Sequence, residues 1–129
     1  MKYRALLTFI LTLNAGLLGV EAVAAGDVEA GGKLYSKTCG GCHSIGENAR
    51  SGFGPHLNGV IGRHAGSLPN YQYSQAMKDS GVVWTPERLA AYIEAPKKVV
   101  KGTRMIFWGI SDPEKIANLL AYIETFNEQ

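Results

Sequence analysis

Three segments of the chain place apolar residues at the spacing of one helix face. The first covers residues 27–37, which begin with an acid and end with a base, as the two ends of a helix favour. Its apolar face is formed by Val28, Leu34 and Tyr35. Gly31 and Gly32 interrupt the segment, and each costs about 1 kcal/mol relative to Ala inside a helix. We therefore expect another helix to pack closely against this pair.

The second and third helical segments start with the same signal, a capping residue followed by a proline and an acid. The second begins at residues 85–87 and ends before Pro96. The third begins at residues 111–114 and runs to about Phe126. Their apolar faces are formed by Leu89, Tyr92 and Ile93 and by Ile116, Leu119, Leu120 and Ile123. A shorter helix is expected around residues 73–79.

Two long loops separate these segments. Residues 46–70 are rich in glycine and include Pro55 and Pro69, which predicts irregular chain wrapped over the rest of the protein. Residues 97–110 lack polar turn residues and carry the apolar run Met105 to Trp108, so we expect this loop to pack inward. No segment alternates apolar and polar residues as a strand does. The predicted fold class is all-α, with three main helices, shorter helices and loops.

The first 25 residues have the composition of a cleaved signal peptide. Lys2 and Arg4 precede a largely apolar stretch, and small residues near position 24 resemble a cleavage site. An uncleaved membrane anchor is the alternative, but the apolar run is shorter than the ~20 residues that a spanning helix needs. We expect export from the cytoplasm and one mature domain, residues 26–129.

The chain is short and carries little net charge. Its 13 Lys and Arg against 11 Asp and Glu give a formal charge of +2, which offers no indication of a nucleic-acid partner. Removal of residues 1–25 takes away two of the basic residues and one of the acidic ones, and leaves +1. A domain of this length buries a modest core. We therefore expect folding to depend on an apolar cofactor.

The strongest chemical signal lies in the two cysteines of the chain. Cys39 and Cys42 are separated by two glycines and followed at once by His43. This C-x-x-C-H pattern is the attachment signature of a c-type haem, in which the thiols form thioethers and the imidazole reaches the iron. A redox-active disulfide of the thioredoxin type would lie in a βαβ unit, and the sequence shows no such unit. A zinc site would have to draw its further ligands from His43, His56 and His64.

We expect one covalent haem c, with His43 as an iron ligand. One ring nitrogen of His43 would bind the iron, and a carbonyl, for which Pro55 is the candidate, would hold the other. The candidates for the sixth ligand are Met77, Met105, His56 and His64. Met77 lies in the expected short helix, where methionine is more often core filler. We favour Met105 because it lies in the inward loop directly after Gly102-Thr103, where the backbone can approach the haem face. His/Met ligation would close the iron, raise the reduction potential and leave one-electron transfer as the chemistry.

Residues 26–129 carry a set of short motifs with a specific spacing. These are Gly26-Asp27-Val28-Glu29, the C-x-x-C-H site, Gly54-Pro55-x-Leu57-x-Gly59, Gly62-Arg63, Trp84, Pro96-Lys97-Lys98 and Gly102-Thr103-x-Met105-Ile106-Phe107. With these motifs the chain resembles class I cytochrome c, of the mitochondrial and related bacterial type. Together with the signal peptide, the resemblance implies a bacterial periplasmic protein.

The resemblance implies roles for the residues around the iron. Cys39 and Cys42 would hold the haem covalently. His43 and Met105 would bind its iron, and Pro55 would orient His43. The residues that match the contact between the first and last helices of the family are Gly31, Leu119 and Tyr122.

It also implies roles for residues farther from the iron. Those that would surround the buried haem propionate are Arg63, Tyr73 and Trp84. Tyr92 would hydrogen-bond the methionine sulfur, Thr103 would bond a propionate and the loop, and Phe107 would shield the haem edge. From the residues alone, Trp84 and Tyr92 are equally well read as core aromatics, and Arg63 as a solvated surface charge.

Two features depart from the family pattern. Met77 stands where the family usually has Asn, so we expect a disturbed polar network beside the haem. The basic ring at the haem edge is thinned, because Thr38 and Gly52 stand at familiar lysine positions and residues 111–113 replace a basic run. The basic residues that remain are Lys37, Lys97, Lys98, Lys101 and Arg104. Trp108 stands where a small residue is expected and adds apolar surface.

The favoured function is a soluble, monomeric one-electron carrier and not an enzyme. The resemblance implies quinol–cytochrome c reductase as electron donor. It implies a terminal oxidase, a photosynthetic reaction centre or another periplasmic reductase as acceptor. The alternatives are a haem peroxidase or sensor, which needs an open or weakly held sixth position, and a fixed electron-accepting subunit of one dehydrogenase.

Overall fold

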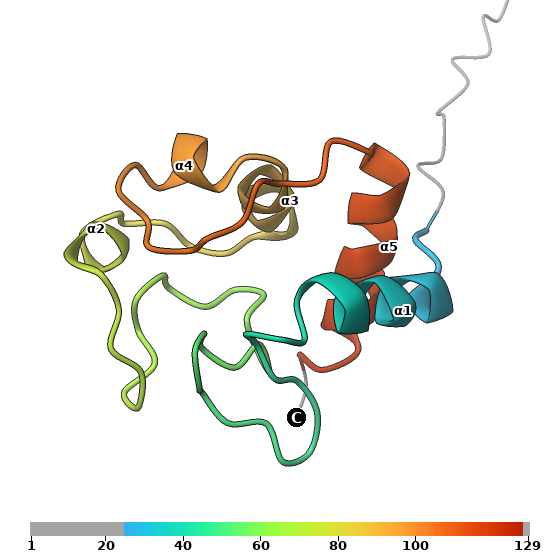
Figure 1. Ribbon diagram of the computed structural model, residues 1–129, viewed down its shortest axis with the longest axis horizontal. Coiled ribbons are helices and arrows are strands. Elements are labelled where there is room, and N and C mark those ends of the chain that lie inside the picture. Colours follow the sequence, from blue (N-terminus) through green and yellow to red (C-terminus); the bar gives the residue numbers. More distant parts are fainter. Residues whose placement is uncertain (1–24, 128–129) are drawn as a thin grey trace, which may run out of the picture.

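The computed structural model describes residues 25–127, and its regular structure is helical (Figure 1). Within this part of the chain the strand-like pairing is one isolated antiparallel bridge, between His64 and Val83. The predicted all-α class is confirmed. Long loops connect the helices and enclose the interior.

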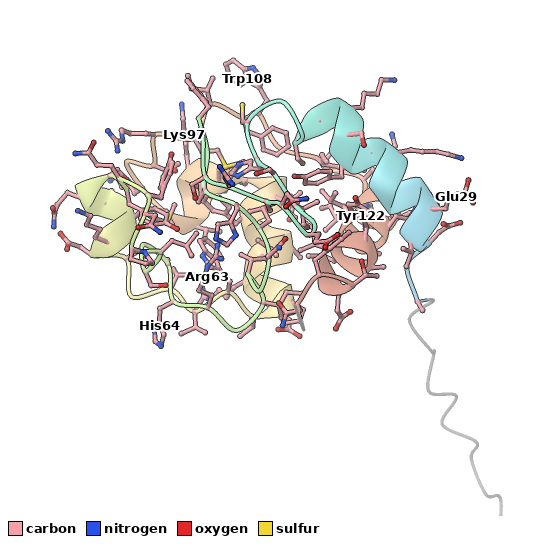
Figure 2. All side chains as sticks on the ribbon, turned by 90° about the horizontal axis from the view of Figure 1, so that it is seen from below. Glu29, Arg63, His64, Lys97, Trp108 and Tyr122 are labelled. Carbon is pink, nitrogen blue, oxygen red and sulfur yellow. The ribbon has the colours of Figure 1, made fainter. Side chains whose placement is uncertain are left out.

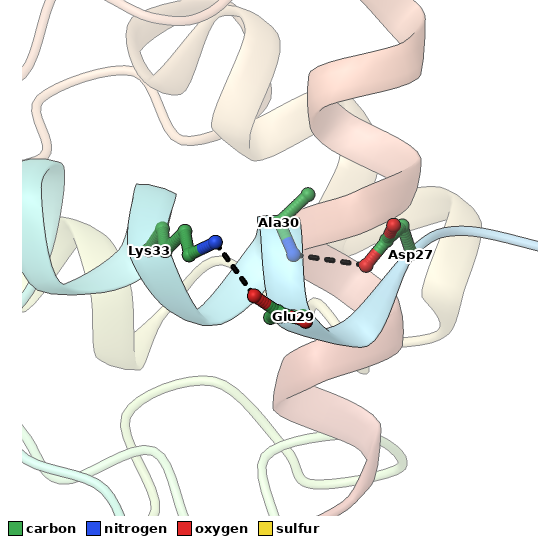
Figure 3. A network of polar contacts seen from close by, with 4 residues as sticks. All are labelled: Asp27, Glu29, Ala30 and Lys33. Atoms are coloured by element: carbon green, nitrogen blue, oxygen red, sulfur yellow. Dashed lines mark hydrogen bonds and ion pairs between the residues drawn. The ribbon is translucent and has the colours of Figure 1, made fainter.

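The first helix, α1, spans Val28–Thr38, one residue later at each end than the pattern predicts. The Asp27 carboxylate caps it by accepting a hydrogen bond from the Ala30 amide at 2.9 Å, which satisfies one of the free donors at the helix start. Figure 3 shows this cap beside the ion pair of Lys33 and Glu29, whose N and O atoms lie 2.6 Å apart. Both charged side chains are largely exposed, so the pair adds little to stability.

The two other long helices begin where the capping signals predict. The α3 helix spans Pro86–Glu94, and the α5 helix spans Pro113–Glu124. The Thr85 hydroxyl accepts a hydrogen bond from the Arg88 amide at 3.2 Å. The Asp112 carboxylate accepts two amide hydrogen bonds from the first turn of α5. Local sequence therefore sets both helix starts.

Two short helices complete the set. The α2 helix, Gln75–Lys78, lies inside the segment where a short helix is expected. The α4 helix, Pro96–Val99, is a turn that the sequence does not predict. Pro96 ends the preceding helix as expected, but its fixed φ also suits the first position of a new helix. The loop after α3 therefore starts with a helical turn.

A close crossing of α1 and α5 explains the glycine pair in α1 (Figure 1). A Cβ atom on Gly31 would lie 1.9 Å from the carbonyl oxygen of Asn118, so the two backbones meet at this position. The Tyr35 and Tyr122 rings pack beside it with centroids 5.4 Å apart. The expected packing partner of the glycines is therefore the last helix.

The core is small and aromatic-rich. Its buried apolar residues are Tyr35, Val60, Trp84, Leu89, Tyr92, Ile93, Val100, Ile116, Leu119 and Ile123. They come from α1, α3, α5 and the loops between them, so each loop contributes to one shared interior. A core of this size supports the expectation of a cofactor that adds apolar contacts.

The loop after α4 packs inward only in part. Met105 and Phe107 are partly buried against the core, as expected. The same expectation is wrong for Ile106 and Trp108, which are 86% and 96% exposed. Burial alternates along residues 103–108, as it does where successive side chains point to opposite sides of extended chain.

The predicted signal peptide, residues 1–25, lies outside the described residues except for its last position. In the part of the chain that the structure covers, no helix has the length and apolar character needed to cross a membrane.

Substitution of Gly31 tests the helix crossing. In Gly31→Ala the new Cβ meets backbone, so we expect a loss of about 1–3 kcal/mol in the free energy of unfolding, despite the better helix propensity of Ala. Denaturant unfolding of the holoprotein measures this change. The control is Gly52→Ala, because a Cβ there meets nothing within 4 Å. Equal stability of the two variants would contradict the close crossing.

Candidate functional site

A cavity with apolar walls, part of it open to solvent, lies inside the molecule. Its lining residues are Cys39, His43, Leu57, Val60, Leu89, Tyr92, Ile93, Met105, Phe107, Leu119 and Ile123. The cavity thus brings together the cysteine motif near the end of α1 and the loop before α5. Four of the residues that the sequence singles out meet here beside Cys39: His43, Tyr92, Met105 and Phe107.

The loop that carries the cysteines, residues 39–43, follows directly from α1. It is tightly turned, because the amides of Cys42 and His43 both donate to the carbonyl of Cys39, at 3.0 and 2.9 Å. No disulfide joins the two cysteines; Cys39 is partly buried at the cavity and Cys42 is exposed. The turn keeps the two thiols and the imidazole within one short stretch of chain.

The His43 ring is held from one side. Its Nδ1 lies 2.7 Å from the carbonyl oxygen of Pro55, which is the partner that the sequence suggests. This bond makes Nδ1 the protonated nitrogen and leaves Nε2 as the free lone pair. Burial lowers the pKa of His43, and the hydrogen bond to Pro55 opposes that shift in part. The neutral ring that results is the form that binds metals.

The segment that carries Met105 is held by a hydroxyl pair. The Tyr92 hydroxyl and the Thr103 hydroxyl lie 2.7 Å apart, and Thr103 Oγ1 also accepts the Met105 amide at 3.2 Å. Burial raises the pKa of Tyr92, so its hydroxyl stays protonated. The partner of Tyr92 in this structure is therefore Thr103. The expected bond from Tyr92 to the methionine sulfur stays a prediction.

A polar group lies beside the cavity, where Arg63 and Trp84 pair through their backbones. The Trp84 amide donates to the carbonyl of Arg63 at 3.0 Å, and the buried Trp84 ring packs on Tyr92 with centroids 4.8 Å apart. The Arg63 guanidinium donates to the carbonyls of Asn58 and His56, while its Nε is buried without a partner.

Arg63 and Tyr73 also influence each other's ionisation. Burial lowers the pKa of Arg63 and raises the pKa of Tyr73, and the attraction between the two groups opposes both shifts. The structure therefore brings together the three residues that the resemblance assigns to a haem propionate. A buried guanidinium N–H without an acceptor is rare in proteins, and a carboxylate would satisfy it.

The other candidate ligands lie away from the cavity lining. His64 is exposed, and its backbone pairs with Val83. His56 lines a separate cavity between residues 49–51 and 68–70. Met77 is partly buried against the core and is not among the residues that line the apolar cavity.

The two alternative uses of the cysteines gain no support. Burial, with a further effect of the neighbouring Cys42 thiol, raises the pKa of Cys39 to about 11. Redox-active C-x-x-C motifs depend on a lowered thiol pKa instead. Within residues 25–127, no three His, Cys, Asp or Glu side chains gather as a metal site would require.

The lining, the thiols and the buried cation fit a haem. The apolar walls suit the porphyrin, Cys39 and Cys42 suit its vinyl groups, His43 Nε2 suits the iron and Arg63 Nε suits a propionate. Fold and site together define a class: small all-α proteins built around a covalent c-type haem.

Comparison with known proteins gives the family. A model of the family cytochrome c matches residues 28–127. Cytochrome c2 of Agrobacterium tumefaciens (strain II Chrys) is 50% identical over 101 residues, 76% of this chain and 90% of that protein. Cytochrome c2 of Blastochloris viridis is 46% identical over 108 residues, 84% of each chain. The solved structure of cytochrome cH from Methylobacterium extorquens has a TM-score of 0.72 and 42% identity, and covers 78% of this chain and 99% of that one.

The chain belongs to the cytochrome c family and is a class I cytochrome c. Its cofactor is one covalently attached c-type haem, for which Cys39 and Cys42 supply the attachment motif. The protein transfers electrons and is not an enzyme. The resemblance and the haem expected from the sequence are thereby confirmed.

Two residues of the site were not singled out for it by the sequence. A Cβ on Gly54 would lie 2.6 Å from His43 Cε1, so the His43 ring needs glycine at this position. The Tyr35 hydroxyl donates to the carbonyl of His43 at 2.6 Å. A glycine directly before Pro55 is a signal that could have indicated the first contact. Helical spacing shows Tyr35 as an apolar residue and gives no sign of its hydrogen bond.

A pH-dependent prediction concerns His56. Burial, followed by the charge of Arg63, lowers its pKa in the folded state, and its Nδ1 is buried without a partner. The unfolded chain then binds a proton near pH 6.5 that the folded protein does not, so the free energy of unfolding falls as the pH drops from 7 towards 5.5.

The variant His56→Asn should reduce this fall, measured by denaturant unfolding of the holoprotein at both pH values, and the part that remains includes the contribution of His43, whose pKa burial also lowers. The control is His64→Asn, which removes an exposed histidine and should leave the fall unchanged. A fall of the same size in His56→Asn would show that another group causes it.

Proposed function

We propose that the protein is a periplasmic one-electron carrier in which His43 and Met105 are the two axial ligands of the haem iron. The observation that carries this proposal is that both side chains line the same apolar cavity, although 62 residues separate them in the sequence. His43 comes from the turn after α1, and Met105 comes from the loop that precedes α5. A haem between them would be reached from two independent parts of the chain.

Three features of the chain prepare His43 for this role. Burial keeps the ring neutral, the carbonyl of Pro55 fixes its tautomer, and Gly54 leaves room for the ring. A hydrogen bond to the second nitrogen also strengthens the imidazole as a ligand.

The support for Met105 comes from its position and its backbone. It lines the cavity, whereas Met77, His56 and His64 are absent from that lining. Its amide is held by Thr103, which in turn bonds Tyr92 of α3. A methionine whose backbone is held in this way would lose little conformational freedom on binding the iron. A thioether ligand also raises the reduction potential of a haem.

The residues around the two ligands would keep water away from the haem and would balance the charge of a haem propionate. With a haem bound, the apolar lining would keep water from the iron, which would lower the local dielectric. Arg63, with Tyr73 and Trp84, would hold one propionate, and Phe107 would cover the haem edge. The bound haem would supply the one-electron couple.

Partner docking would use the surface beside Phe107. Ile106 and Trp108 expose an apolar patch there, and Figure 2 shows Trp108 on the same side of the molecule as Lys97. The exposed basic residues of the docking region are Lys97, Lys98, Lys101 and Arg104. Such a surface fits a transient partner with an acidic rim, with quinol–cytochrome c reductase as donor and an oxidase, reaction centre or periplasmic reductase as acceptor.

The periplasmic location rests on the first 25 residues, which have the charge, apolar stretch and small residues of a signal peptide. Cleavage near residue 25 would leave the mature domain that begins just before α1. Mass spectrometry of the exported protein gives the cleavage site directly.

The optical spectrum tests the ligand assignment. Oxidised His/Met haem shows a weak far-red band, which Met105→Ala should abolish. Met77→Ala is the matched control and should keep the band, since Met77 does not line the cavity. Loss of the band in Met77→Ala and not in Met105→Ala would assign the ligand to Met77 instead.

A second test concerns docking. Trp108→Ala should slow second-order electron transfer with quinol–cytochrome c reductase about fivefold to tenfold, as loss of an aromatic anchor does at interfaces. The control is Val28→Ala, an exposed apolar residue at the start of α1. We also expect a shallow decline of the rate with ionic strength, because the basic ring is thin. A steep decline with no effect of Trp108→Ala would point to docking by charge alone.

A further inference from the structure

Tyr35, in the last turns of α1, binds the cysteine loop at both of its ends. Its backbone carbonyl accepts hydrogen bonds from the amides of Cys39 and Gly40, at 2.7 and 2.8 Å. Its side-chain hydroxyl donates to the carbonyl of His43 at 2.6 Å. One residue therefore holds the beginning and the end of the pentapeptide that attaches the haem.

The same residue belongs to the crossing of α1 and α5. Its side chain is 5% exposed, and its ring packs against the Tyr122 ring of α5 with centroids 5.4 Å apart. Tyr122 also contacts the glycine pair of α1, where the backbones of the two helices meet. Packing of the last helix therefore determines where the Tyr35 hydroxyl lies.

The hydroxyl donates to His43 from a residue that is only 5% exposed, so water has little access to compete for the bond. A partly buried carbonyl that loses its donor is costly. Loss of the Tyr35 hydroxyl should therefore loosen the backbone at His43.

We propose that Tyr35 is a positioning residue that fixes the backbone of His43, so that two hydrogen bonds determine the position of this iron ligand. Tyr35 holds the backbone carbonyl of His43, and Pro55 holds the Nδ1 of its ring. Together they define both where the residue sits and how the imidazole is turned. The inference rests on the proposed ligation of the iron by His43.

The variant Tyr35→Phe removes the hydroxyl and keeps the ring that packs on α5. Tyr122→Phe is the matched control. It removes a hydroxyl from the same ring pair, and the hydrogen bonds of the described residues use the Tyr122 carbonyl and not its hydroxyl. Both variants are compared as holoproteins.

Two measurements separate positioning from general stability. Hydrogen exchange at the amides of Cys39, Gly40 and His43 reports opening of the loop, and exchange at Leu119 reports the α5 core. Paramagnetic NMR shifts of the His43 ring and the haem methyls in the oxidised protein report the orientation of the axial imidazole.

We expect Tyr35→Phe to speed exchange of the loop amides about tenfold more than exchange at Leu119, and to move the His43 and haem methyl shifts. Tyr122→Phe should change neither. Failure of Tyr35→Phe alone to yield holoprotein would also support the proposal, because one hydroxyl is lost and the packing ring remains.

Unchanged His43 shifts with equal acceleration of exchange at the loop and at Leu119 would overturn the proposal, since Tyr35 would then act on stability alone. The far-red band of the unsubstituted protein tests ligation separately. A protein with the band but without the Tyr35 effect refutes the positioning role, and a protein without the band refutes the proposed His/Met site.

Discussion

The close crossing of α1 and α5 is the contact on which the rest of the structure depends. Gly31 lets the backbone of α1 meet the carbonyl of Asn118 in α5, and this fixes the direction in which α1 ends. The cysteine loop follows at once and is tied back to Tyr35 in the last turns of the helix. The location of His43 is thus set by helix packing that lies outside the cavity. A cofactor site whose loops are tied to packed helices in this way keeps its geometry better than one built on free loops.

Polar and apolar groups are divided sharply around the cavity. Its walls are apolar, and the groups that shape it act through backbone carbonyls and hydroxyls, at Pro55 for His43 and at Thr103 for Met105. The buried Arg63 is held from behind by two carbonyls, with its Nε left for a further acceptor. This division suits a haem, which is apolar over its ring and charged at its propionates. It also suits electron transfer, which needs a dry and nearly unchanging environment.

The sequence predicts the parts of the structure that depend on local signals. Thr85 and Asp112 are followed by proline, and both helices start there. The C-x-x-C-H spacing likewise specifies the cofactor, and Gly54-Pro55 indicates the carbonyl that holds His43. The features that the sequence does not predict depend on tertiary contacts, or on local backbone geometry that the apolar character of a residue does not reveal. Ile106 and Trp108 are apolar yet exposed, because side chains alternate along residues 103–108, and the Tyr35 hydroxyl bond depends on where α1 ends relative to the loop.

In this account the chain fills both axial positions of the iron with its own side chains, which makes the protein a carrier. His43 and Met105 reach one cavity from two separate loops, and each is restrained by hydrogen bonds to its surroundings. Carbon monoxide binding to the reduced holoprotein at neutral pH tests this closure most directly, because the gas needs an open or easily vacated iron position. We predict no binding on mixing. Rapid and complete formation of the carbon monoxide adduct would contradict a closed carrier and would favour an enzyme or a sensor.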